Sequence, residues 1–109
     1  MSRREAGIKP YKHSKKQLKI DRQEALKAGT CVVDAMGAHN AKVMGDWWTE
    51  KLGFEVSPEK AASNPYVAAV YAAYWAHFVR HTAWNVPSWY RDAQRCGGGE
   101  AAMRLLGEK

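Results

Sequence analysis

The chain has 109 residues and a formal net charge of +6, and 46% of its residues are hydrophobic. These values are typical of one globular domain that buries its own core without structural metals or disulfides. A membrane-spanning helix is excluded, because no apolar run reaches about 18 residues. No signal peptide precedes the two widely spaced cysteines, Cys31 and Cys96, so we expect a cytoplasmic protein with reduced thiols.

The positive charge is concentrated in the first part of the chain. Residues 1–30 hold nine basic and three acidic residues, whereas residues 31–109 hold eight of each sign. The first segment therefore accounts for the whole net charge of +6. A basic segment on a neutral body is common in proteins that bind polyanions, so this asymmetry is the clearest functional indication in the sequence.

Residues 1–13 are predicted to form a flexible basic arm, because they contain a glycine, a proline and few apolar side chains. A first helix is predicted from Ser14 to Ala28. Ser14 and Gln17 have the spacing of a capping box, and Gly29 can end the helix in the left-handed conformation. The apolar stripe of this helix is thin and consists of Leu18, Ile20, Ala25, Leu26 and Ala28.

The cations of the arm and the first helix are the strongest candidate binding site. Contact with phosphates requires positive charge and reach but no fixed base geometry. Cations at the start of a helix also oppose the helix dipole, and a bound anion would relieve that repulsion. The alternative is a solvated segment that only keeps the protein soluble. The predicted nucleic-acid-binding residues are Arg3, Arg4, Lys9, Lys12, Lys15, Lys16, Lys19 and Arg22.

A second helical region is predicted over residues 30–52, where apolar residues recur at helical spacing. A break is expected at Gly37–Asn40, and Gly53 is expected to end the region. Ser57 and Pro58 then begin a short helical turn, because serine caps a helix and proline fits its first position.

The longest apolar stretch, residues 64–85, is predicted to be the central helix of the protein. Its large apolar residues come in adjacent pairs every four positions, as in Tyr66 and Val67. Only a helix brings such pairs to one face. Alanines fill the positions between the pairs, so another backbone can approach closely. Asn64 is a good cap for this helix, and Pro65 fits its first position.

Two short helices are predicted after the central one, over residues 88–95 and 100–106, with a break at the glycines of residues 97–99. No segment reads as a sheet strand. We therefore expect an all-α, single-domain bundle of about four to five helices in residues 14–109, preceded by the flexible arm of residues 1–13.

The sequence contains no strong catalytic or metal motif. His77 and His81 have a spacing that suits a shared metal, but the glutamate of a helical zinc-protease motif is missing. Cys31 with Asp34 and a histidine could form a nucleophilic set, although a cysteine is more often a packed core residue. The glycines at residues 97–99 lack the lysine and hydroxyl of a phosphate-binding loop. We therefore predict a non-enzymatic protein without a cofactor or metal.

Adjacent aromatic residues form a second candidate surface. One residue of each pair, Trp47-Trp48 and Trp89-Tyr90, can face the core while the other faces outward. We expect Trp48 or Trp89 to be partly exposed and predict Trp48, Trp89 and Tyr90 as partner-binding residues. Exposed aromatic side chains anchor protein partners or stack on bases.

The aromatic-rich helix followed by Val86-Pro87-Ser88-Trp89 resembles the end of some small bacterial and phage accessory proteins, over a short part of the chain. Small size, a basic arm and no catalytic motif are also usual for phage-encoded proteins that redirect their host. The resemblance carries no functional residues over to this chain.

The function favoured by the sequence is a small binding protein that engages nucleic acid, or a nucleoprotein complex, through residues 3–22. The alternative is a protein-binding inhibitor, or an antitoxin-like or phage accessory protein, that acts through exposed aromatic residues. A homo-oligomer is compatible with either function, because alanine-rich helices also pack well between subunits.

Overall fold

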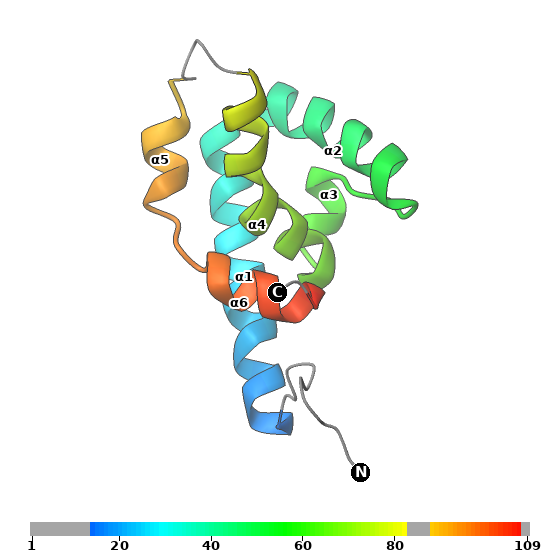
Figure 1. Ribbon diagram of the computed structural model, residues 1–109, viewed down its shortest axis with the longest axis vertical. Helices are drawn as coiled ribbons and strands as arrows, with labels where there is room; N and C mark the ends of the chain where they lie inside the picture. The colour runs from blue at the N-terminus through cyan, green and yellow to red at the C-terminus, as the bar shows by residue number, and fades with distance from the viewer. Residues whose placement is uncertain (1–13, 83–87, 108–109) are drawn as a thin grey trace.

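The computed structural model describes residues 14–82 and 88–107, and all regular structure in these two ranges is helical. Figure 1 shows the helices packed into one body. The predicted all-α fold is confirmed, with six helices in the described residues, two of which are single turns of four and five residues. The helices are α1 (Lys15–Met36), α2 (Ala38–Leu52), α3 (Pro58–Ala61), α4 (Pro65–Thr82), α5 (Tyr90–Gln94) and α6 (Gly99–Leu106).

Three helix starts are formed by the side chains that the sequence predicts. In each, a serine or asparagine oxygen accepts hydrogen bonds from N–H groups of the first turn, which have no partner within the helix. Proline occupies the first position of α3 and of α4, where no N–H group is required. The bonds run from Gln17 N to Ser14 Oγ (3.0 Å), from Lys60 N to Ser57 Oγ (3.1 Å), and from Tyr66 N and Val67 N to Asn64 Oδ1 (2.9 and 3.3 Å).

The first helix is longer than predicted, because Gly29 does not end it. α1 continues to Met36 and ends at Gly37, which has a φ of 88°. Gly29 is buried where α1 crosses α4: a Cβ atom there would lie 2.6 Å from the Cα atom of Ala68 and closer still to its carbonyl oxygen. The glycine therefore allows a close helix crossing and does not form a turn. The region predicted over residues 30–52 accordingly divides at Gly37 between α1 and α2.

Two helices, α1 and α4, share the centre of the fold. α1 contacts each of the other five helices, whereas α4 packs mainly against α1, α3 and α6. Figure 1 shows α4 lying along α1, with α5 on one side and α2 and α3 on the other. α4 contributes the longest buried run, residues 67–72. The helix predicted to be central, α4, therefore shares the centre of the fold with α1.

The interior has two parts of different composition. Where α1, α4 and α6 meet, it is built almost entirely from alanine, which lets three helices approach closely. That part consists of Ala25, Ala28, Ala69, Ala72, Ala102 and Leu105. Where α2 and α5 pack on α4, aromatic rings fill the space: Trp48 lies edge-on to Tyr71 with ring centroids 5.2 Å apart, and Trp75 lies edge-on to Tyr90 at 5.4 Å.

Tyr71 lies fully buried at the centre of the aromatic part. Its hydroxyl donates a hydrogen bond of 2.5 Å to the carbonyl oxygen of Ala41 in α2. Gly45 leaves room for this hydroxyl, because a Cβ atom there would lie 2.7 Å from it. Burial raises the pKa of Tyr71 well above its ordinary value, and the carboxylates of Glu59 and Asp46 raise it further. The neutral hydroxyl therefore joins α4 to α2 at ordinary pH.

A disulfide bond joins Cys31 in α1 to Cys96, which follows α5. The two Cα atoms are 5.6 Å apart although 65 positions separate the residues in the sequence. The expectation of reduced thiols is therefore wrong for this structure, because the fold brings together two cysteines whose spacing gave no sign of pairing. The bond fixes the end of α5 to α1, just before the glycines that lead into α6.

Candidate nucleic-acid interface

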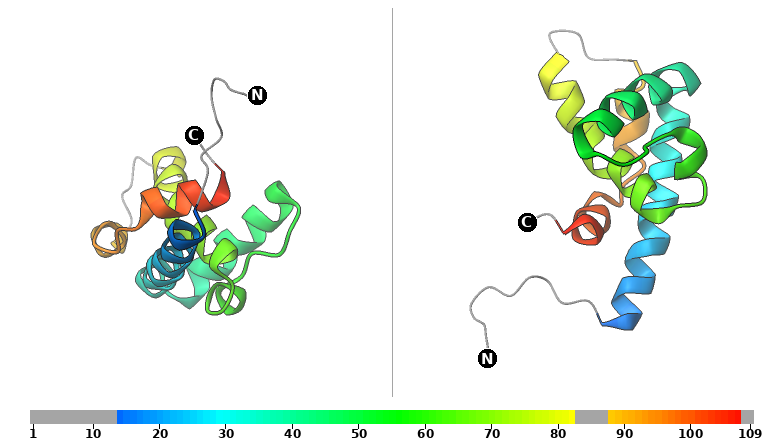
Figure 2. Two further views of the ribbon diagram at one scale, coloured as in Figure 1. Left: turned by 90° about the horizontal axis from the view of Figure 1, so that it is seen from below. Right: turned by 90° about the vertical axis from the view of Figure 1, so that its right-hand side faces the viewer.

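The first two turns of α1 project beyond the rest of the protein. Residues 14–20 include no buried residue, and the first buried residue of α1 is Asp21. Figure 1 shows this end of α1 extending away from the other helices, and the right-hand view of Figure 2 shows the same projection from a second direction. The start of α1 is thus accessible to a large partner.

Three of the predicted nucleic-acid-binding cations lie on this part of α1 and a fourth, Arg22, follows directly after it; all four are exposed. They are Lys15, Lys16, Lys19 and Arg22, which we call the basic face. At 3.6 residues per turn they fall within about 120° of the helix circumference. Among the described residues, none of the four forms an ion pair. The other predicted cations, Arg3, Arg4, Lys9 and Lys12, lie outside the described residues.

A buried carboxylate holds the start of α1 to the body of the protein. Asp21 is fully buried, and Arg104 of α6 donates two hydrogen bonds to it, of 3.0 and 3.2 Å. Gln17 Nε2, one turn earlier on α1, donates to the same carboxylate at 3.0 Å. An arginine bound through two nitrogens fixes orientation as well as charge. This contact therefore sets the direction in which α1 leaves the body. The positive charge of Arg104 also compensates the negative charge of Asp21, which lies next to the basic face.

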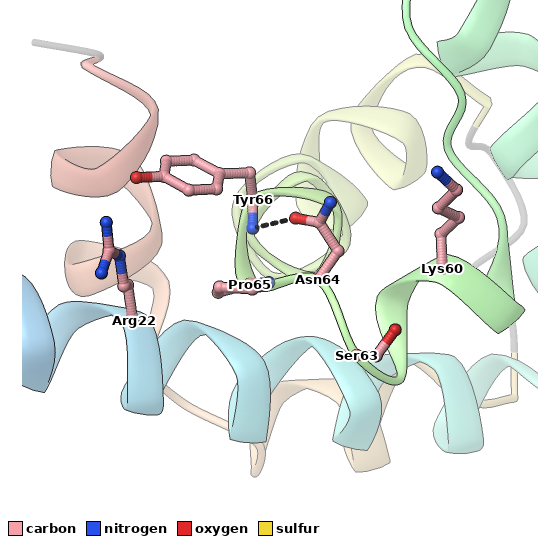
Figure 3. Close-up of a pocket in the computed structure, with 6 residues that line it drawn as sticks. All are labelled: Arg22, Lys60, Ser63, Asn64, Pro65 and Tyr66. Atoms are coloured by element: carbon pink, nitrogen blue, oxygen red, sulfur yellow. Dashed lines mark hydrogen bonds between the residues drawn. The ribbon is translucent and has the colours of Figure 1, made fainter.

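A shallow hollow at the start of α4 extends the positive surface. Figure 3 shows Arg22 rising from α1 on one side of it and Lys60 coming from α3 on the other, with the first residues of α4 between them. Lys60 has an acidic neighbour, Glu55, at 3.8 Å, but at least half of each side chain is exposed, so water screens the pair. Sequence reasoning missed Lys60, because only the fold places it in the same hollow as Arg22. The hollow is lined by Arg22, Lys60, Ser63, Asn64, Pro65 and Tyr66.

The predicted aromatic surface is not formed by the residues assigned to it. Trp48 and Trp89 are buried, with 3% and 8% of their surface exposed, so the expectation that one of them is exposed is wrong. Tyr90 is half-buried against Trp75. Adjacent helical residues point about 100° apart, and the packing of α2 turns Trp48 inward and leaves Trp47 39% exposed. The sequence shows two adjacent tryptophans but does not show which of them is buried.

The structure shows the state of the candidate nucleophile Cys31 and of most of the candidate metal ligands. Cys31 is bonded to Cys96 and provides no thiolate nucleophile in this state. Among the described side chains, those of residues 14–76 and 88–107, no three histidine, cysteine or acidic groups come together to hold a metal ion. The side chains of His77 and His81 lie outside what the structure describes. None of the helices in the described residues has the length and apolar character needed to cross a membrane.

Comparison with known proteins adds no assignment. The chain matches no protein-family model, no curated protein and no solved structure. The functional conclusion rests on the geometry and charge of the molecule.

Proposed function

We propose that this protein is a small non-enzymatic nucleic-acid-binding protein, which acts on nucleic acid alone or within a nucleoprotein complex. One observation carries the proposal: the four cations of the basic face lie exposed on one side of a projecting helix, without ion-pair partners among the described residues. The phosphate backbone supplies the complementary charge. Contact with it requires neither a catalytic group nor a deep cavity.

The position of the basic face at the start of α1 supports the same proposal. The first turn of α1 contains no acidic residue, and Lys15 and Lys16 lie there instead. Positive side chains at this end are repelled by the positive end of the helix dipole, which lowers the stability of the free protein. A bound phosphate backbone removes that repulsion, so the placement is unfavourable for stability alone and favourable for binding a polyanion.

The expected salt dependence follows from the number of cations. Neutralising about four phosphates of duplex DNA predicts a slope near −3.6 in a plot of log affinity against log salt concentration, from about −0.9 per phosphate. Contacts from Arg3, Arg4, Lys9 and Lys12 would make the slope steeper. A protein that binds through its apolar surface would show almost no slope.

The test measures affinity for a labelled DNA duplex and a single-stranded RNA by fluorescence anisotropy across a salt series. The wild-type protein is compared with a basic-face variant and with a control that loses the same number of exposed charges on α2, on α5 and at the residue that follows α5. The basic-face variant carries Lys15→Gln, Lys16→Gln, Lys19→Gln and Arg22→Gln. The control carries Lys42→Gln, Lys51→Gln, Arg91→Gln and Arg95→Gln, all at exposed positions.

We expect the control to keep the wild-type slope, apart from a small general loss of affinity. The basic-face variant should lose at least tenfold in affinity at low salt, and its log–log salt slope should become less negative by about 3.6. Circular dichroism of both variants should show an intact helical fold. Equal losses in the two variants would contradict this site, and no binding by the wild-type protein at low salt would contradict the function.

We place the protein in the cytoplasm as part of the same proposal. The bond between Cys31 and Cys96 bears directly on this, because disulfides persist mainly in oxidising compartments. Alkylation of free thiols in intact cells, followed by measurement of the protein mass, distinguishes the two states. Two alkylated cysteines would agree with a cytoplasmic location, whereas a protected disulfide would argue against it.

A protein-binding surface is the second candidate function, and one observation favours it. Val43 and Trp47, one turn apart on the outer side of α2, expose 50% and 39% of their surface. An exposed tryptophan is a common anchor in protein interfaces. If this surface is the working one, Trp47→Ala should abolish partner binding, and the basic-face variant should leave it unchanged.

A further inference from the structure

The side of α1 that faces away from the core carries more than positive charge. Five exposed residues lie there, and we call them the outer stripe: Lys16, Lys19, Ile20, Gln23 and Lys27. At 3.6 residues per turn they span about 100° of the circumference, opposite the buried residues of α1. The outer stripe is therefore a continuous surface that the other helices of the described structure leave uncovered.

Ile20 is the member of the outer stripe that phosphate binding does not explain. The sequence assigns it to the apolar packing stripe of the first helix, but it points outward with 39% of its surface exposed. Gln23 lies three residues further on and is therefore its neighbour on the helix surface. Lys16 and Lys19 precede this pair, and Lys27 follows it. An apolar group and an amide thus lie between cations.

This combination matches the major-groove edge of base pairs. An apolar side chain contacts the methyl group of thymine, and a glutamine pairs with the donor and acceptor of adenine. Lys16 and Lys19 before this pair, and Lys27 after it along the helix, contact phosphates, which fixes the position of a helix in the groove. If the outer stripe bound only phosphates, lysines at all five positions would bind them equally well.

The outer stripe favours duplex DNA over other nucleic acids. The major groove of B-DNA is about 12 Å wide and admits an α-helix, whereas the major groove of duplex RNA is too deep and narrow for side chains to read. Single strands are bound largely by stacking on aromatic side chains. α1 contains no aromatic residue over its whole length.

The projection of α1 gives it the reach that groove entry requires. Six helical residues, Lys15 to Ile20, precede the first buried residue of α1. The outer stripe, from Lys16 to Lys27, runs about 17 Å along the helix at 1.5 Å per residue. A helix lying side-on along this length fits the major-groove width of about 12 Å. The contact between Asp21 and Arg104 holds this end of the helix to α6, so the helix enters the groove as a rigid unit.

We infer that α1 lies in the major groove of duplex DNA along residues 16–27, with its outer stripe towards the bases. Ile20 and Gln23 contact base edges, and the lysines that precede and follow them along the helix contact phosphates. This inference rests on the proposed nucleic-acid-binding function and deepens it, because it names the partner as duplex DNA and the binding mode as direct reading of the major groove.

The first experiment compares the affinity of the full-length protein for four probes of one sequence at one salt concentration. The probes are a DNA duplex, the same duplex as RNA, a single DNA strand, and a DNA duplex whose cytosines carry bulky 5-glucosyloxymethyl groups that fill the major groove. We expect the unmodified DNA duplex to bind at least tenfold more tightly than each of the others. Equal affinity for the modified and unmodified duplexes would overturn the inference but leave the proposed function standing. No binding to any probe would overturn both.

The second experiment tests Ile20 and Gln23 by selection of preferred sites from a pool of random-sequence DNA duplexes. The wild-type protein should enrich a sequence motif, whereas the variant with Ile20→Ala and Gln23→Ala should bind the unselected pool with an unchanged salt slope and enrich none. The control variant, Val43→Ala with Gln94→Ala, removes an exposed apolar group and an exposed amide elsewhere. It should enrich the wild-type motif. Enrichment of the same motif by the Ile20 and Gln23 variant, or of no motif by the wild-type protein, would overturn direct reading by these residues.

Discussion

The two halves of α1 differ sharply, although they form one continuous helix. In the first half, no residue before Asp21 is buried, and three lysines occupy the first two turns. In the second half, small residues pack against α4, and a backbone contact at Gly29 leaves no room for a side chain. The second half fixes where the helix lies, and this leaves the first half free to serve as a charged surface.

The contact of Asp21 with Arg104 marks the point at which burial of α1 begins. A buried charge is tolerated only where a partner compensates it, and Arg104 does so through two hydrogen bonds. Substitutions at the buried positions of α1 should therefore lower stability, and substitutions at its exposed positions between residues 15 and 27 should lower binding.

Removal of the disulfide by Cys31→Ser with Cys96→Ser should lower the free energy of unfolding by about 4 kcal/mol, from the loop entropy of a bond between residues 65 positions apart. Urea unfolding of the oxidised wild-type protein and of the double variant measures the difference. At low urea the variant should still bind DNA, because the bond lies in the second half of α1. Loss of DNA binding by a folded variant would contradict the claim that stability and binding depend on different parts of α1.

Gly29→Val should lower the free energy of unfolding by about 3 kcal/mol or more, because the new side chain collides with the backbone of Ala68. Asp34→Val, at an exposed position of the same helix, is the matched control for the helix propensity of valine and should cost less than about 1 kcal/mol. Thermal unfolding followed by circular dichroism measures both. Similar losses of stability in the two variants would show that the close approach of α1 and α4 does not restrict the side chain at position 29.

Asp21→Asn should lower the free energy of unfolding by about 2 kcal/mol, less than the about 3–5 kcal/mol usual for breaking a buried pair. We expect this smaller loss of stability because the Arg104 side chain is 35% exposed and stays partly hydrated when its partner loses its charge. Asp92→Asn breaks an exposed pair with Arg95 and should cost less than about 0.5 kcal/mol. Urea unfolding of the two variants compares them, and an Asp21→Asn variant as stable as the Asp92→Asn control would contradict this role.

Lys16→Glu should raise the free energy of unfolding by about 0.5 kcal/mol, because it places a negative charge at the start of α1, where the helix dipole favours one. The same change should weaken DNA binding severalfold, because it removes a cation from the basic face. Unfolding and binding measured on one sample give both effects. A variant that is less stable and binds equally well would reverse the relation between the two halves.

Local features of the fold could be predicted from the sequence, whereas features that depend on a second helix could not. The caps at Ser14, Ser57 and Asn64 are confirmed, because each involves residues within three positions of one another. The end of α1 was predicted wrongly at Gly29, because its role depends on the backbone of α4. The disulfide was missed for the same reason.

The candidate site shows the same division. The exposure of Lys15, Lys16, Lys19 and Arg22 agrees with the predicted surface, because a run of charges in one helix cannot all be buried. The addition of Lys60 depends on where α3 lies beside α1, so the sequence did not indicate it. The outward orientation of Ile20 and the burial of Trp48 depend on helix phase relative to the core, which neighbouring residues in the sequence do not fix.

The most direct test of the central claim is a titration of the ¹⁵N-labelled protein with a short DNA duplex at low salt, followed by backbone amide chemical shifts. The account predicts shift changes concentrated in residues 14–27, with smaller ones around the hollow that contains Lys60. The basic-face variant should show almost none. Changes clustered instead on α2 around Val43 and Trp47, or no changes at any duplex concentration, would contradict the assignment of α1 as the nucleic-acid-binding surface.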